Sequence, residues 1–179
     1  MVSNMIFNRE SIYIRMNAVR YAKTYALSPN PSFKYFKVYE TLGGDCTNFT
    51  SQCLLAGGAP MTYNSEYAWW YNKSVTYDTK DDSWSVPWAV AHSLYWTLKV
   101  NQQYSNFGIK GLEVNDVSTL ELGDLIFYEG DKGTIYHSAI ITSFSNSKPL
   151  ISQHTFDALN IPYLKTWKAR RIHFIKISL

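Results

Sequence analysis

Apolar residues recur at helical spacing in the first part of the chain. Between Arg9 and Leu27 they return every three or four positions, which predicts a helix that Ser28-Pro29-Asn30-Pro31 ends. A second helix is expected from Asp45, a good N-cap residue, to about Ala56, where Gly57-Gly58 follows. A third is expected to start at Ser83 or Ser85 and to run to about Lys99.

The period changes to that of strands in the second part of the chain. Four segments are rich in β-branched and aromatic residues and are separated by turns of Gly, Asp, Ser and Asn. These predicted strands are Gly123–Tyr128, His137–Phe144, Leu150–His154 and Arg170–Ile177. Helices followed by an antiparallel sheet predict an α+β fold, and residues 1–179 are enough for a single domain.

Composition and charge exclude several classes of protein. With 46% hydrophobic and 17% charged residues, the chain has the composition of a folded globular protein. The net charge of +3 comes without a stripe of Lys and Arg, so we expect no nucleic-acid partner. No run of eighteen apolar residues predicts a membrane span, so we expect no membrane insertion. We also expect a monomer.

The N-terminal segment Met1 to Glu10 has no apolar core of a signal peptide. Three explanations stay open: a cytosolic location, export by another route, or earlier removal of a leader.

The chain has two cysteines, Cys46 and Cys53, with different expected roles. On one helix their Cα atoms would lie roughly 10 Å apart, beyond the ~7 Å limit of a disulfide, so two free thiols are expected. Cys53 falls on the apolar side of the helix and is expected to pack there. Cys46 falls in the first turn, where the helix dipole favours a thiolate. Position alone leaves a nucleophile and a small buried residue about equally open for Cys46.

Two of the four histidines are candidates for a partner of that thiol. His137 begins one predicted strand and His154 ends the next, so an antiparallel hairpin would bring both to the same end of the sheet. A base and an orienting group need that arrangement. Gln153 would face away from the site if His154 faces into it. We interpret His92 and His173 as structural.

Other chemistries have little support in the sequence. It contains no His-x-x-x-His, Cys-x-x-Cys or His-Glu-x-x-His spacing, so we expect neither a metal nor a cofactor. A glycosidase would need two facing carboxylates, and no spacing singles out such a pair.

Four motifs occur in a recognisable order. They are Gly44–Gln52, Leu122–Phe127, Tyr136–Ile141 and Gln153–Thr155. Together they resemble the putative amidase domain family, which is similar to the papain-like cell-wall cysteine hydrolases that include NlpC-type and CHAP domains. The resemblance implies a papain-like fold, with N-terminal helices packed on a C-terminal antiparallel sheet.

The same resemblance implies a function and a set of residues. Cys46 would be the nucleophile, His137 the base and His154 the orienting third residue. The substrate would be peptidoglycan, cut by an N-acetylmuramoyl-L-alanine amidase or a stem-peptide endopeptidase. Such an enzyme would act at the bacterial cell wall, as the catalytic domain of a phage endolysin or a secreted autolysin. A non-catalytic wall-binding module on the same scaffold is the alternative.

Substrate contacts are expected from Asp45, beside the nucleophile, and from four tryptophans. The tryptophans are candidates for the walls of a groove, although each could equally be a core residue. They are Trp69, Trp70, Trp84 and Trp88.

Overall fold

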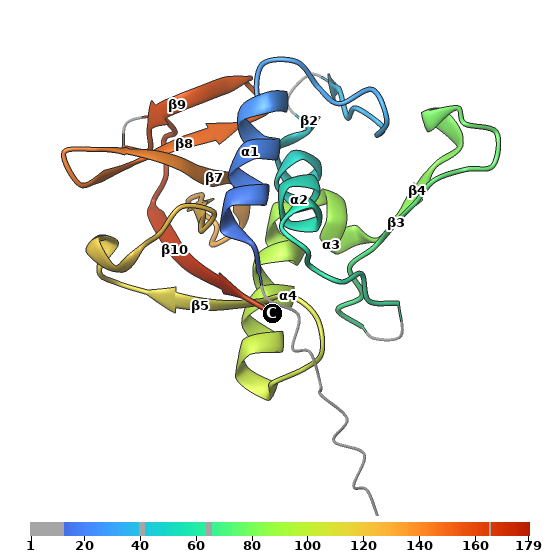
Figure 1. Cartoon of the computed structure of the whole chain (residues 1–179). Coiled ribbons are helices and arrows are strands. Elements are labelled where there is room, and N and C mark those ends of the chain that lie inside the picture. The colour runs from blue at the N-terminus through green and yellow to red at the C-terminus, as the bar shows by residue number, and fades with distance from the viewer. Residues whose placement is uncertain (1–12, 40–41, 64–65, 165) are drawn as a thin grey trace, which may run out of the picture.

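A six-stranded antiparallel sheet forms the centre of the structure. A computed structural model describes residues 13–39, 42–63, 66–164 and 166–179. The strand order in the sheet is β5-β10-β6-β7-β8-β9 (Figure 1). The strands are β5 (Lys110–Val114), β6 (Leu125–Glu129), β7 (Ile135–Ser145), β8 (Lys148–Gln153), β9 (Ala158–Pro162) and β10 (Arg171–Ser178).

Helices pack against one face of this sheet. They are α1 (Arg15–Tyr25), α2 (Cys46–Ala56), the short α3 (Val86–Ala89) and α4 (Ala91–Tyr104). Three of them, α1, α2 and α4, contact β7, which lies in the middle of the sheet (Figure 1). The main hydrophobic core lies between these helices and the sheet, and it includes Phe49, Trp88, Leu98 and Phe127. The predicted α+β class is therefore confirmed.

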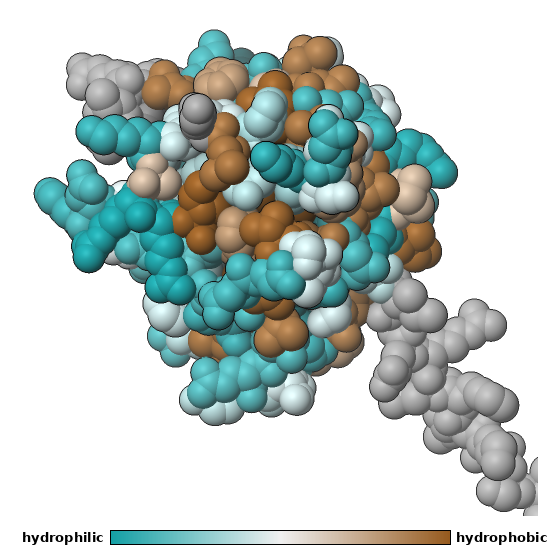
Figure 2. All heavy atoms as spheres, turned by 90° about the vertical axis from the view of Figure 1, so that its left-hand side faces the viewer, coloured by the Kyte–Doolittle hydropathy of each residue, from teal (hydrophilic) through white to brown (hydrophobic). Residues whose placement is uncertain are grey.

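A second, smaller core lies on the opposite face of the sheet. Ile126, Tyr128, Ala139 and Ile151 point to this side, where Tyr163 also packs. The 3-10 turn η2 (Val117–Thr119) lies near this core. Figure 2 views the molecule from the sheet side and shows apolar side chains interspersed with polar ones. Because both faces are covered, the middle strands are apolar on both sides.

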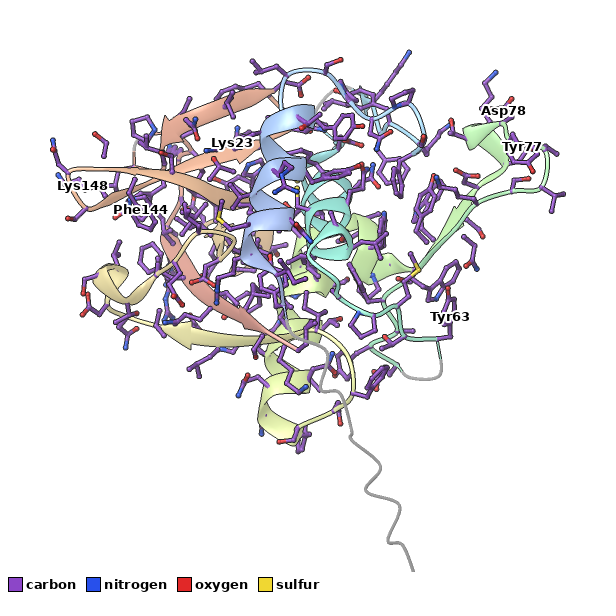
Figure 3. The ribbon with its side chains drawn as sticks, viewed as in Figure 1. Lys23, Tyr63, Tyr77, Asp78, Phe144 and Lys148 are labelled. Atoms are coloured by element: carbon purple, nitrogen blue, oxygen red, sulfur yellow. The ribbon has the colours of Figure 1, made fainter. Side chains whose placement is uncertain are left out.

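Two short hairpins lie outside the main sheet. Strands β1 (Val38–Tyr39) and β2 (Leu42–Gly43) immediately precede α2. Strands β3 (Tyr71–Asn72) and β4 (Ser83–Trp84), with the 3-10 turn η1 (Thr79–Asp81), form an arm that projects from the body (Figure 1). Tyr77 and Asp78 lie at the outer end of this arm (Figure 3).

The predicted elements are largely confirmed, with differences at one helix and two strands. The helix expected from Arg9 is observed over Arg15–Tyr25, and residues 9–12 lie outside the described part of the chain. The third helix is broken at Val90, whose backbone is extended. Next to the break, the carbonyl of Trp88 accepts a hydrogen bond from the hydroxyl of Ser51 on α2. No helix among the described residues is long and apolar enough to cross a membrane.

The edge strands β5 and β9 were not expected from the sequence. Strand β5 contains Gly111, where a Cβ atom would lie 2.5 Å from Cγ2 of Ile175 and 2.8 Å from Cβ of Leu98. Glycine is therefore required by the close approach of α4 and β10, although it weakens the strand pattern. Strand β9 ends at Pro162, which an edge strand tolerates.

The buried carboxylate of Asp124 joins the start of α1 to the loop before β6 and to the end of β10. Asp124 is fully buried and accepts hydrogen bonds from Nη1 of Arg15 at 2.5 Å and from the backbone amides of Glu121 and Ile177. Arg15 also donates to the carbonyls of Leu122 and Ile177. The ion pair thus ties three segments that are distant in the sequence.

We expect Asp124→Ala to lower the free energy of unfolding by about 3–5 kcal/mol, because removing one partner of a buried pair leaves the other partner's charge and two amides unsatisfied. Urea unfolding followed by circular dichroism measures this change. The control is Glu121→Ala, which removes a largely exposed carboxylate 3.5 Å from Arg15 and should cost less than about 1 kcal/mol. Equal losses in the two variants would contradict the role assigned to Asp124.

Candidate active site

Cys46 occupies the first position of α2, as the sequence predicts. The turn before it contains Gly43 and Gly44, with φ angles of 83° and 125°. At Gly44 a Cβ atom would lie 2.8 Å from the side chain of Thr155, so this glycine lets the segment after β8 approach the start of α2. The backbone amide of Asp45 donates to the hydroxyl of Thr155 at the same place. The turn that leads to Cys46 is therefore packed against, and bonded to, Thr155 in the segment after β8.

The thiol of Cys46 is buried among hydrogen-bond donors. Its Sγ lies 3.6 Å from Oγ1 of Thr47, which lies 3.2 Å from the hydroxyl of Ser138. Burial raises the pKa of Cys46, and the hydrogen bond with Thr47 lowers it in part. The resting thiol is therefore protonated at neutral pH.

The sulfur lies where β8 separates from β7. Ile141 directs its backbone groups to Gly123 and Asp124, on the β6 side of β7. By the alternation of an antiparallel strand, Ser138 directs its amide to the other side, toward β8. The last β7–β8 partners are Ile140 and Ser152, so the position opposite Ser138 has no strand partner there. The hydroxyl of Ser138, one residue from His137, instead lies 3.2 Å from Oγ1 of Thr47, next to Cys46.

His137 is oriented by Gln153 and not by His154, which corrects the expected arrangement. Nε2 of His137 lies 2.9 Å from Oε1 of Gln153. That oxygen also accepts from Nε1 of Trp167, and the amide nitrogen of Gln153 donates to the carbonyl of Phe156. These contacts fix Oε1 as the acceptor, so Nε2 of His137 carries its proton and Nδ1 is the basic nitrogen.

The ring of His137 is almost fully buried. It packs against Trp167, with ring centroids 4.1 Å apart, on the side of the second core. Burial lowers its pKa to about 3, and the bond to Gln153 partly opposes this. The imidazole is therefore neutral at physiological pH and can accept a proton. The hydrogen bonds of the described residues include none between this ring and the sulfur of Cys46.

His154 has a different partner, Asp45. Nδ1 of His154 lies 2.5 Å from Oδ2 of Asp45, and Nε2 lies 2.8 Å from the carbonyl of Tyr25. Both ring nitrogens face acceptors, so both carry protons and the ring is a cation. Burial lowers the pKa of His154, but the bonds to Asp45 and Tyr25 outweigh burial and raise it overall. Strand alternation explains the difference, because Gln153 and His154 point to opposite faces of the sheet.

Asp45 is therefore a structural anchor in this geometry, although it was expected to contact substrate. Only 1% of its surface is exposed. It precedes α2 without capping the helix through its side chain. Instead, Oδ1 accepts from the backbone amide of Phe36 and the side chain of Asn48, and Oδ2 faces His154.

The four tryptophans divide between the core and the surface. Trp69 and Trp88 are buried, and their indole nitrogens donate to Ser51 and Asn48, which excludes them as groove walls. Trp70 is half-buried and stacks on Tyr63. Trp84 lines a cavity next to Gly43 and Gly44.

The remaining expectations for the site concern Cys53 and metals. Cys53 is fully buried in the main core, and both cysteines are free thiols, as predicted. No cluster of three or more His, Cys, Asp or Glu residues suited to a metal occurs in the part of the chain that the structure describes. The sequence did not identify Gln153 as the partner of His137, because strand alternation predicts only that Gln153 and His154 face opposite sides of the sheet.

We expect His154→Gln to lower the free energy of unfolding by about 3–5 kcal/mol at pH 6, because Asp45 would keep a buried charge without its partner. The folded-state pKa of His154 is raised above about 6.5, its value in an unfolded chain. The stabilisation is thus complete below pH ~6.5 and is lost as the pH rises through the folded-state value.

Urea unfolding of both proteins from pH 6 to pH 9 measures the effect. The difference between wild type and variant should shrink as the pH rises. The control is His92→Gln, which makes the same replacement at a partly exposed histidine of α4. A difference that stays constant with pH would contradict a charged His154.

Comparison with known proteins agrees with the sequence motifs. The family model described as putative amidase domain matches residues 12–177. Two proteins of Bacillus subtilis (strain 168) are similar: the uncharacterized protein YhbB, 35% identical over 85% of this chain, and the uncharacterized protein YjcM, 35% identical over 81%. The matched regions cover 44% and 31% of those proteins, so the chain spans less than half of their length. No solved structure matches. The chain belongs to the putative amidase domain family.

Proposed function

We propose that the protein is a thiol amidohydrolase with Cys46 as nucleophile, His137 as base and Gln153 as the residue that orients His137. The observation that carries this proposal is the bond from Nε2 of His137 to Oε1 of Gln153. It leaves Nδ1 as the basic nitrogen of a neutral ring, in the residue before Ser138, whose hydroxyl contacts Thr47 next to Cys46. A nucleophile, a base and an orienting group are the minimum set for covalent acyl transfer.

The reaction follows from these protonation states. Nδ1 of His137 takes the proton of the Cys46 thiol as the sulfur attacks the amide carbonyl. The imidazolium then gives its proton to the leaving amine, and a thioester to Cys46 remains. Water, deprotonated by His137, attacks the thioester and releases the acid and the thiol. The amides at the start of α2 can stabilise the oxyanion, because Asp45 does not cap them.

Burial keeps both the Cys46 thiol and the His137 imidazole neutral before substrate binds. The pKa of Cys46 is raised and that of His137 is lowered, so a resting thiolate–imidazolium pair is disfavoured. Proton transfer is then coupled to attack on the carbonyl.

The proposed substrate is peptidoglycan of the bacterial cell wall, cut at an amide bond. Family membership supports an amidase, and the resemblance to papain-like cell-wall hydrolases supports the wall as target and a papain-like version of the α+β fold. A muramoyl-alanine amidase and a stem-peptide endopeptidase both fit this chemistry, in a phage lysis enzyme or a secreted autolysin. The greater length of the relatives leaves room for other domains in a complete protein.

We expect Cys46→Ala to abolish the release of soluble fragments from purified cell walls, because no other thiol of the chain lies at a helix start. Turbidity loss measures the activity, and mass spectrometry of the fragments identifies the bond that is cut. The control is Cys53→Ala, which removes the buried second thiol and should keep most activity. Undiminished release by Cys46→Ala would refute the enzyme and favour a wall-binding module.

We expect Gln153→Leu to reduce kcat on the order of 100-fold, because His137 would lose the partner that fixes its tautomer. His154→Gln, measured at a temperature where it stays folded, should reduce kcat far less. Circular dichroism checks folding of both variants. The reverse order of activities would return the orienting role to His154.

A further inference from the structure

A cavity of about 600 Å³ is lined by Gly43 and Gly44, three and two residues before Cys46 in the chain. Its walls come from the segment Lys34–Lys37, the glycine turn before α2, the arm and the junction of α3 and α4. In Figure 1 the loop after α1 and the arm face each other on the side where α2 begins. The volume lies within the range of small-molecule and peptide sites.

The cavity is coupled to the catalytic residues through the backbone. Gly43 and Gly44 line it and are followed at once by Asp45 and Cys46. The amide of Phe36, another lining residue, donates to Asp45. A ligand in the cavity would therefore contact the stretch of backbone that leads directly to Cys46.

The lining combines aromatic surface with positive charge. Phe36 and Trp84 pack together with ring centroids 4.6 Å apart, and Tyr35 is also exposed to the cavity. Lys34, Lys37 and Lys80 are the charged residues of the lining, which contains no Asp or Glu. Among the described residues, no hydrogen bond or ion pair engages the ammonium groups of these lysines. The lining thus combines apolar side chains with three lysines that form no ion pair within the described part of the chain.

We propose that this cavity is the specificity pocket of the enzyme and that it binds a carboxylate-bearing stretch of the stem peptide next to the bond that is cut. This inference rests on the proposed function, because the substrate class comes from there. The aromatic side chains bind the aliphatic part of the peptide, and Lys34, Lys37 and Lys80 attract its carboxylate. A peptide whose carboxylate is converted to a carboxamide is then a weaker ligand.

Binding to an inactive protein tests the pocket separately from catalysis. The probe is the synthetic peptide L-alanyl-γ-D-glutamyl-L-lysine, compared with the same peptide carrying the glutamyl α-carboxylate as a carboxamide. Both are titrated by calorimetry into Cys46→Ala protein at low and high salt. We expect the acid to bind more tightly than the carboxamide, with a preference that declines as salt screens the charges.

Single changes of Lys34, Lys37 and Lys80 to Gln should each weaken binding of the acid by about two- to fivefold. The triple variant should lose on the order of 10- to 100-fold and keep the affinity for the carboxamide. The matched control is Lys148→Gln, which removes a lysine at the opposite side of the molecule from the arm (Figure 3). Its affinity for the acid should stay unchanged.

Two results would contradict the proposed role of the cavity: equal affinity for the acid and the carboxamide peptide, or unchanged affinity of the triple variant for the acid peptide. Neither result touches the enzyme proposal, which fails only if Cys46→Ala protein still releases wall fragments. Conversely, a Cys46→Ala protein that prefers the acid peptide and also releases fragments would keep the pocket and refute the proposed nucleophile.

Discussion

The geometry of the site depends on the buried ion pair between Asp45 and His154. Asp45 comes directly before Cys46 and is bonded to Phe36 and Asn48. His154 joins this carboxylate to the last turn of α1 through the carbonyl of Tyr25. One pair of side chains therefore sets the position of the nucleophile relative to a helix, a loop and the end of β8. Burial makes the pair costly to break, because either partner alone would be an unpaired charge.

Two adjacent residues at the end of β8 serve the two halves of the site. Gln153 faces the second core and bonds to His137, whereas His154 faces the helices and bonds to Asp45, next to Cys46. The pleat of the strand explains this division, since neighbouring side chains point to opposite faces. Cys46 thus lies on the helix side of the sheet and His137 on the side of the second core, near the end of the pairing between β7 and β8.

Local signals in the sequence were enough to predict much of this. The glycine turn, the N-terminal position of Cys46 and the strands β6, β7 and β8 depend on residues close in the chain, and each was predicted. The break at Val90 was not predicted, because no local pattern in the sequence marks it; beside it, Trp88 bonds to the distant Ser51. Local sequence patterns also could not decide whether Gln153 or His154 bonds to His137, because that depends on the distant residues Asp45 and Trp167. Trp69 and Trp88 could not be told from surface tryptophans until their buried partners were known.

The break between α3 and α4 has a consequence for how this scaffold could change its preference among ligands. Trp88 fills the core on one side of the break, while Ala89 and Val90 border the cavity on the other. A core residue and two lining residues of the cavity are thus neighbours in the chain. Replacements at Lys34, Lys37 and Lys80 alter only the rim, which makes this region a natural starting point for directed evolution toward neutral or basic peptides.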